Sequence, residues 1–201
     1  MSKPLRPSLI GTSRLEAFSD GVLAILITIM AFQLVPPEGG RLADLRDVVP
    51  DVLAFALSFV FLGIYWNNHH HLFRATEHID AAVMWANLGL LFALTLIPAA
   101  TAWLGSHHGD AGPTALYGLI SLFAGVAYWI LAQSIIRVNP DSVVAARIGR
   151  DRKGVISVVL YASGTALAFV SPYLGLAMYV AAAVLWIVPD RRLADVELSG
   201  G

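Results

Sequence analysis

Long apolar runs alternate with short polar segments along the 201-residue chain. A helix needs about 20 mostly apolar residues to cross the hydrocarbon core of a bilayer. Six stretches suit such helices, and they cover residues 14–35, 50–73, 81–104, 114–137, 154–170 and 172–188. The last two are separated at Ser171-Pro172 because the apolar run that contains them is too long for one helix. The pattern predicts an all-α polytopic membrane protein, with residues 1–201 forming a single six-helix transmembrane domain.

The composition supports a membrane protein. Hydrophobic residues make up 57% of the chain and charged residues 13%, against about 25% charged residues in soluble domains. The chain has thirteen basic and fourteen acidic residues, so there is no surplus of positive charge that would predict binding to nucleic acid. The chain has no cysteine, which excludes thiolate metal sites and cysteine nucleophiles.

The basic residues are unevenly distributed between the two sides of the predicted membrane. Only Arg41 and Arg46 fall on one side. The others fall on the opposite side, and they are Lys3, Arg6, Arg14, Arg74, Arg137, Arg147, Arg150, Arg152, Lys153, Arg191 and Arg192. Because short cytoplasmic loops carry the excess of Lys and Arg, we expect both termini in the cytoplasm and an even number of spans.

The first predicted helix carries acidic side chains near its start. Ser13-x-x-Glu16 has the form of a capping box that would begin the helix, and Asp20 lies about one turn further along. A charged carboxylate inside a span is costly unless it has partners. We expect these partners among the polar ends of the next two helices, at Asn67, Asn68, His69, His70, His71, Trp85 and Asn87. Asp20 then either joins helices by hydrogen bonds or carries protons or ions, and both interpretations stay open.

Helical periodicity divides the rest of the first helix into two sides. At about 100° per residue, one stripe contains Phe18, Gly21, Ile25, Thr28, Ile29 and Phe32. Nearly opposite lie Asp20, Ala24, Ile27 and Ala31. From periodicity alone, packing against helices or lipid explains the stripe better than a function does.

The sequence offers little evidence for catalysis or metal binding. His69, His70 and His71 are adjacent and therefore point about 100° apart on a helix, so they do not converge on one metal ion. There is no G-x-S-x-G elbow and no glycine-rich phosphate loop. We predict neither an enzyme nor a bound metal. Pro98 is expected to kink the third helix.

A longer motif opens the first helix. Arg14-Leu15-Glu16-Ala17-Phe18-Ser19-Asp20 is followed by Gly-Val-Leu-Ala-Ile-Leu-Ile-Thr-Ile. This string, Arg-x-x-x-Phe-Ser-Asp and the residues after it, resembles the first-helix signature of the transmembrane protein 175 family of endolysosomal and prokaryotic potassium channels. Six spans, cytoplasmic termini and a length near 200 residues are similar to the single-repeat prokaryotic members.

The resemblance implies a homotetramer in which the first helix of each subunit lines a central pore. It implies a hydrophobic constriction, or gate, at Ile25 and further pore layers at Thr28, Ile29 and Phe32, with the Thr28 hydroxyl tuning potassium preference. It also implies a network that fixes the first helix, formed by Arg14, Phe18, Ser19 and Asp20, with His70 and Trp85 as expected partners.

Two functional hypotheses follow, besides a membrane scaffold without transport. The first is a potassium-permeable, modestly K+-selective channel of the cell membrane, whose partners are K+ ions and the lipid bilayer and which needs no cofactor. The alternative is a secondary or proton-coupled transporter that uses Asp20 and the cluster His69–His71. Transporters often contain internal repeats, and because none is visible in this sequence we favour the channel.

Overall fold

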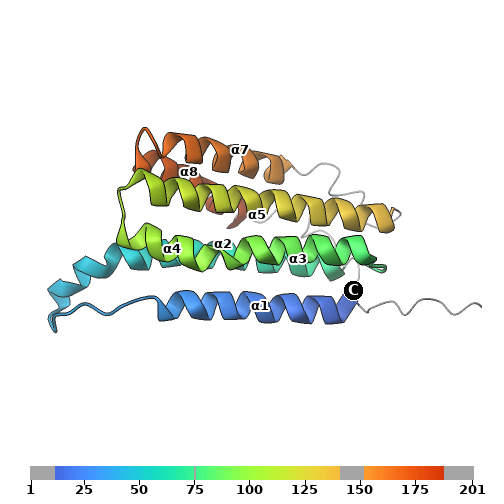
Figure 1. Cartoon of the computed structure of the whole chain (residues 1–201), viewed down its shortest axis with the longest axis horizontal. Helices are drawn as coiled ribbons and strands as arrows, with labels where there is room; N and C mark the ends of the chain where they lie inside the picture. Colours follow the sequence, from blue (N-terminus) through green and yellow to red (C-terminus); the bar gives the residue numbers. More distant parts are fainter. Residues whose placement is uncertain (1–11, 75, 141–151, 188–201) are drawn as a thin grey trace, which may run out of the picture.

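The computed structural model describes residues 12–74, 76–140 and 152–187, and all regular structure in those ranges is helical (Figure 1). In chain order the elements are α1 (Thr12–Phe32), η1 (Leu42–Val48), α2 (Val49–Arg74), α3 (Ala81–Thr95), α4 (Ile97–Ser106), α5 (Ala111–Val138), α7 (Arg152–Leu167) and α8 (Pro172–Ile187). The prediction of an all-α fold is confirmed. Each of the six predicted stretches forms one helix or, in the third, a pair of helices.

The ends of α1 differ from the sequence-based expectation. Ser13 lies inside the helix, after Thr12, so it is not the residue that caps it, and the predicted capping box is wrong. At the other end α1 stops at Phe32 and not at Val35. Val35 precedes Pro36, and a residue before proline is pushed away from the helical conformation.

Prolines divide the apolar stretches at two places. The third stretch breaks at Leu96 into α3 and α4, with Pro98 in the first turn of α4, where its missing N–H leaves no hydrogen bond unmade. The kink predicted at Pro98 is therefore confirmed as a helix break. The last stretch turns after Leu167, whose carbonyl accepts from the Ser171 amide at 2.8 Å, and Pro172 begins α8. The predicted division at Ser171-Pro172 is confirmed.

The helices differ in length. Four helical units among the described residues are long and apolar enough to cross a membrane, namely Thr12–Phe32, Leu42–Arg74, Ala81–Ser106 and Ala111–Val138. Helices α7 and α8 have 16 residues each, which gives about 24 Å at 1.5 Å per residue. They are apolar but shorter than the roughly 30 Å of a hydrocarbon core.

Helix α1 lies at one side of the bundle and α7 with α8 at the other (Figure 1). It packs against α2, α3 and α4 of its own chain. Helix α5 lies between, in contact with α3, α4, α7 and α8. Within the part of the chain that the structure describes, α1 is therefore supported on one flank only.

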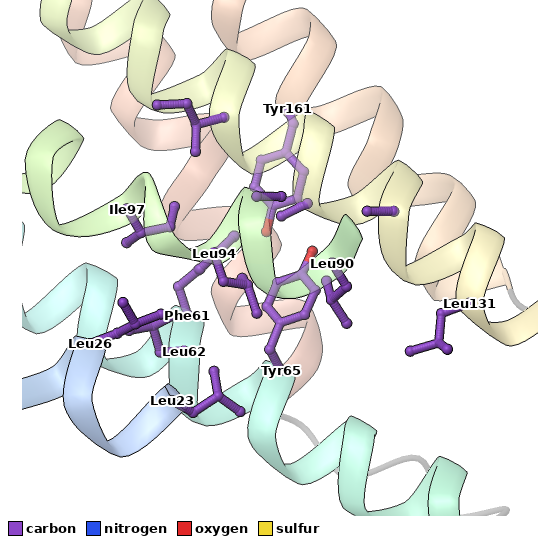
Figure 2. Packing of buried hydrophobic residues seen from close by; sticks show 14 of the residues in the cluster. Leu23, Leu26, Phe61, Leu62, Tyr65, Leu90, Leu94, Ile97, Leu131 and Tyr161 are labelled. Carbon is purple, nitrogen blue, oxygen red and sulfur yellow. The ribbon is translucent and has the colours of Figure 1, made fainter. Parts of the chain in front are cut away.

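The core combines aliphatic side chains with satisfied polar groups. Leu23 and Leu26 of α1 point toward Phe61 and Leu62 of α2 (Figure 2). Deeper in the bundle, the Ser58 hydroxyl lies 2.7 Å from the Thr101 hydroxyl and 3.1 Å from that of Tyr117, joining α2, α4 and α5. Polar groups inside a membrane need internal partners because lipid offers none. This buried cluster therefore joins the three helices, and its hydroxyl groups are paired with one another.

Basic and acidic side chains are unevenly distributed between the two ends of the bundle. Alternating helix directions bring Arg14, Arg74, Arg137 and Lys153 to one end. At the same end, Arg137 donates to the Asp80 carboxylate at 2.7 Å. The other end holds the acidic residues of η1 and the loop before it. The distribution agrees with the orientation inferred from the basic residues, which stays a prediction.

Candidate functional site

Helix α1 binds the rest of the chain through a single stripe of buried residues. This buried stripe consists of Leu15, Ser19, Leu23, Leu26 and Met30. Ala24 and Ala31, which periodicity placed nearly opposite Ile25, are exposed. The face that packs inside the chain is instead the flank carrying larger side chains, because these fill the space against α2, α3 and α4.

The residues predicted to line a pore lie together on the outward side of α1. We call Phe18, Gly21, Ile25, Thr28, Ile29 and Phe32 the outer stripe; all six are exposed. Ile25 keeps 60% of its surface exposed and Phe32 keeps 84%. Large apolar side chains this exposed face lipid or another protein surface in a membrane. Among residues 12–74, 76–140 and 152–187, the outer stripe thus has no packing partner.

A second exposed pattern runs beside the outer stripe and was missed from the sequence. Small side chains recur at alternating spacings of four and three residues, and we call them the small-residue edge: Ala17, Gly21, Ala24, Thr28 and Ala31. A Cβ atom added at Gly21 would meet no atom within 4 Å. Small residues on one helix flank allow a second helix backbone to approach closely in lipid. The spacing itself was the signal that could have revealed this edge.

The hydroxyl of Thr28 has a defined orientation. It donates to the Ala24 carbonyl one turn earlier, at 2.9 Å. With its proton used in this bond, the oxygen presents only lone pairs to its surroundings. Thr28 can therefore act as an acceptor toward a cation or water on the outward side of α1.

A buried hydrogen-bond chain fixes the start of α1 to α3 and α2. The Asn87 amide donates to the Ser19 hydroxyl at 2.9 Å, and that hydroxyl donates to the Leu15 carbonyl at 2.9 Å. The Asn87 carbonyl oxygen accepts from His69 Nε2 at 2.8 Å. Ser19, Asn87 and His69 are each at most 1% exposed. Asn87 and His69 were expected to bind Asp20, but in the structure they are bonded to Ser19 and to each other.

A second polar contact joins α1 to α2 one turn closer to the helix start. His70 Nδ1 donates to the Glu16 carboxylate at 2.7 Å, and the Trp66 ring stacks on His70 with centroids 6.2 Å apart. His70 was expected to pair with Asp20, so that assignment is corrected. Asp20 Oδ1 is buried and makes no hydrogen bond within the described residues.

Other members of the predicted network lie on the surface of the single chain. Arg14 is exposed, Phe18 is half exposed and Trp85 is 74% exposed. The structure therefore brings Ser19 and His70 into contacts that hold α1, and it leaves these three residues facing outward.

The histidine cluster does not converge. His69 points toward Asn87, His70 toward Glu16, and His71 is exposed. In the part of the chain that the structure describes, no group of three or more His, Asp or Glu side chains could hold a metal ion.

An acidic cavity lies where α1 ends. It has a volume of about 480 Å³ and is lined by residues of the loop after α1, of η1 and of the start of α2. Its acidic residues are Glu38, Asp44, Asp47 and Asp51. Arg41 neutralises part of this charge through a contact of 3.1 Å to Asp44. The cavity therefore presents a net negative surface beside the end of the outer stripe.

Comparisons with known proteins agree on one kind of relative. Residues 14–98 match the family described as endosomal/lysosomal potassium channel TMEM175. A potassium channel of Chryseobacterium sp. (strain P1-3) is 45% identical over 181 residues, covering 90% of this chain and 94% of that protein. A potassium channel of Streptomyces collinus is 33% identical, covering 84% and 87%.

A solved structure resembles the fold as well. The crystal structure of a lysosomal potassium-selective channel TMEM175 homolog from Chamaesiphon minutus superposes with a TM-score of 0.78 at 28% identity. The superposition covers 88% of this chain and 96% of that one. The likeness therefore extends over nearly the whole bundle and is not confined to α1.

Proposed function

The chain belongs to the TMEM175 family, and from this membership we infer that it is a potassium channel of the membrane. It is a multi-pass membrane protein and an ion channel, not an enzyme. The similar potassium channels come from bacteria, so its site of action is the plasma membrane. The alternative of a transporter that uses Asp20 and the cluster His69–His71 does not agree with the channel activity for which the similar proteins are named.

We propose that four copies assemble around a central pore lined by α1. One helix cannot enclose a water-filled path, so the outer stripe needs partner helices. The exposed small-residue edge supports this arrangement because it offers a flank on which a second α1 can pack closely. Packing there would place the outer stripes of neighbouring copies around a common axis.

We propose that Ile25 forms the constriction of this pore. A ring of aliphatic side chains narrows the path and can gate it by expelling water. The observation that supports this role is that Ile25 is 60% exposed in the middle of a helix whose other flank is buried. Thr28, one turn further, would supply oxygen lone pairs that replace part of the hydration shell of K+.

We propose that the acidic cavity concentrates cations at the mouth beyond Phe32. Clefts lined by one sign of charge raise the local concentration of the opposite ion. Glu38 and Asp47 are exposed and carry no hydrogen bond to a described residue that would neutralise them. These two carboxylates would attract cations that enter from this mouth, before the cations reach the constriction at Ile25.

The decisive experiment measures ion flux through the purified protein in liposomes. Opposed K+ and Na+ gradients should produce unitary currents whose reversal potential lies toward that of K+. Saturable, proton-dependent uptake without unitary currents would contradict the channel. Chemical cross-linking of the purified protein in detergent should reach a tetramer.

A further inference from the structure

A second cavity of about 700 Å³ lies between α2, α5 and α7, on the flank of the bundle away from the outer stripe. We call it the lateral groove. It occupies the half of the bundle that contains the basic ends of the helices, because its lining begins near the middle of α2 and α5 and reaches the first residues of α7. Residues of the first helix take no part in it.

The walls of the lateral groove are mostly apolar, with Asn68, Gln133 and Ser157 as polar members, and they open toward the bilayer. Val126, Trp129, Val155 and Val159 line it and are each at least 39% exposed. Tyr65 and Tyr161 form its floor; both are buried, and their hydroxyl ends point toward one another in Figure 2. An exposed apolar concavity inside a membrane is filled by hydrocarbon chains.

The mouth of the groove carries groups that suit a lipid headgroup. The Lys153 ammonium lies 5.8 Å from the centroid of the Trp186 ring, and Trp186 donates its indole N–H to the Ser157 hydroxyl at 2.8 Å. Tryptophan favours the membrane interface, so this pair marks the level of the lipid phosphates.

We propose that the lateral groove binds one anionic phospholipid, with an acyl chain along its apolar walls and the phosphate at Lys153. Basic pockets between transmembrane helices on the cytoplasmic side are suited to anionic headgroups. A second copy of the chain fits less well here, because α7 lies on the opposite side of the bundle from the exposed α1 (Figure 1). The proposal does not depend on which ion the channel conducts.

Native mass spectrometry of the full-length protein tests the proposal. Phosphatidylglycerol and phosphatidylcholine with identical acyl chains are added to detergent-solubilised protein, and the retained lipid is counted. The wild type should retain phosphatidylglycerol in preference to phosphatidylcholine. Lys153→Gln should lower this preference about fivefold, the effect of one basic residue near an anionic surface. The matched control Arg74→Gln, at the same end but outside the groove, should not lower it.

A second variant fills the groove. A Cβ atom at Gly125 would lie 3.8 Å from the Tyr65 hydroxyl and 3.9 Å from Val158 Cγ2, which is ordinary contact, so Gly125→Leu places its bulk in the groove without a clash at the backbone. It should abolish retention of both lipids, whereas Ala162→Leu, on the exposed side of α7, should not. If Gly125→Leu does not fold, Val126→Phe supplies the same test.

Three results would overturn the lipid site. One is equal retention of phosphatidylglycerol by wild type and the groove-filling variants. Another is an equal loss of preference in Arg74→Gln and Lys153→Gln, which indicates general attraction to the basic end. The third is a change of oligomeric state in Gly125→Leu with lipid retention unchanged, which assigns the groove to a second copy of the chain.

Discussion

Single residues on α1 have either an inward or an outward role, and their exposure separates the two. Ser19 is fully buried and bonded, whereas Ile25, less than two turns later, is 60% exposed. The 100° periodicity predicted the outer stripe, and the family resemblance carried by the motif predicted a pore-lining role for it. The pairing of Glu16 with His70 could not be predicted, because Ser13-x-x-Glu16 offered a local explanation for Glu16 that needs no other helix.

Replacing Ile25 tests the constriction. Ile25→Asn should raise the single-channel conductance several-fold and reduce discrimination between K+ and Na+, because polar side chains hold water where the aliphatic ring excludes it. Recordings in planar bilayers measure both quantities. The matched variant Ile25→Leu keeps an aliphatic ring and should behave like wild type. Unchanged currents in a well-folded Ile25→Asn protein would remove Ile25 from the ion path.

Replacing Asn87 tests the buried hydrogen-bond chain. Asn87→Leu leaves the His69 N–H and the Ser19 hydroxyl without their partner, and an unpaired buried polar group costs about 1–3 kcal/mol. We expect a lower melting temperature in detergent. The control Asn67→Leu changes an exposed residue of α2 and should have little effect. Equal stability of the two variants would mean that this chain of hydrogen bonds does not hold α1.

At the scale of elements, prolines determine where the apolar stretches divide into separate helices, and close contacts between side chains determine how these helices pack. Pro98 and Ser171-Pro172 were readable from the sequence because proline acts on its immediate neighbours. The packing face of α1 was not readable, because Ala24 and Leu23 are both apolar and only the shape of α2, α3 and α4 decides between their two flanks. The spacing of the small-residue edge is likewise present in the sequence, but only the structure shows that these residues are exposed and so available to another helix.

Gly105 in α4 shows how closely two elements approach. A Cβ atom at this position would collide with the Asp51 carboxylate and lie 2.9 Å from the Asp51 Cα. Gly105→Ala should therefore push α4 from α2 and lower the free energy of unfolding by about 1–3 kcal/mol, as overpacking does. In Gly63→Ala the added Cβ meets no atom within 4 Å. That control should be neutral or slightly stabilising, and thermal melts of both variants compare them.

At the scale of the whole molecule, assembly is expected to depend on the exposed flank of α1. Gly21→Leu adds bulk where the single chain has open space, so the subunit itself should fold normally. If neighbouring α1 helices meet at the small-residue edge, the variant should shift the protein from tetramer to smaller species in size-exclusion chromatography with light scattering. Ala162→Leu, which adds a similar bulk on the exposed side of α7, should stay tetrameric. A tetrameric Gly21→Leu protein would place the contact between copies elsewhere.

The net negative charge of the acidic cavity predicts a salt dependence. Glu38→Gln combined with Asp47→Asn should reduce the current of cations that enter from the acidic side at low ionic strength, because surface charges act over about 30 Å at 0.01 M salt. At 1 M salt, where this length falls to about 3 Å, the variant and wild type should conduct alike. Glu77→Gln, at the opposite end, should not change this inward current, and a difference that persists at high salt would point to a change in the pore itself.

The short helices α7 and α8 have a consequence for the surrounding bilayer. Their described residues span about 24 Å each, which is several ångströms less than a typical hydrocarbon core, while α5 beside them has 28 residues. Such hydrophobic mismatch is relieved by local thinning of the lipid, at a fraction of a kcal/mol per ångström. We therefore expect the rim of the bundle formed by α7 and α8 to favour shorter acyl chains, so that the thickness of the host membrane influences the channel from its periphery.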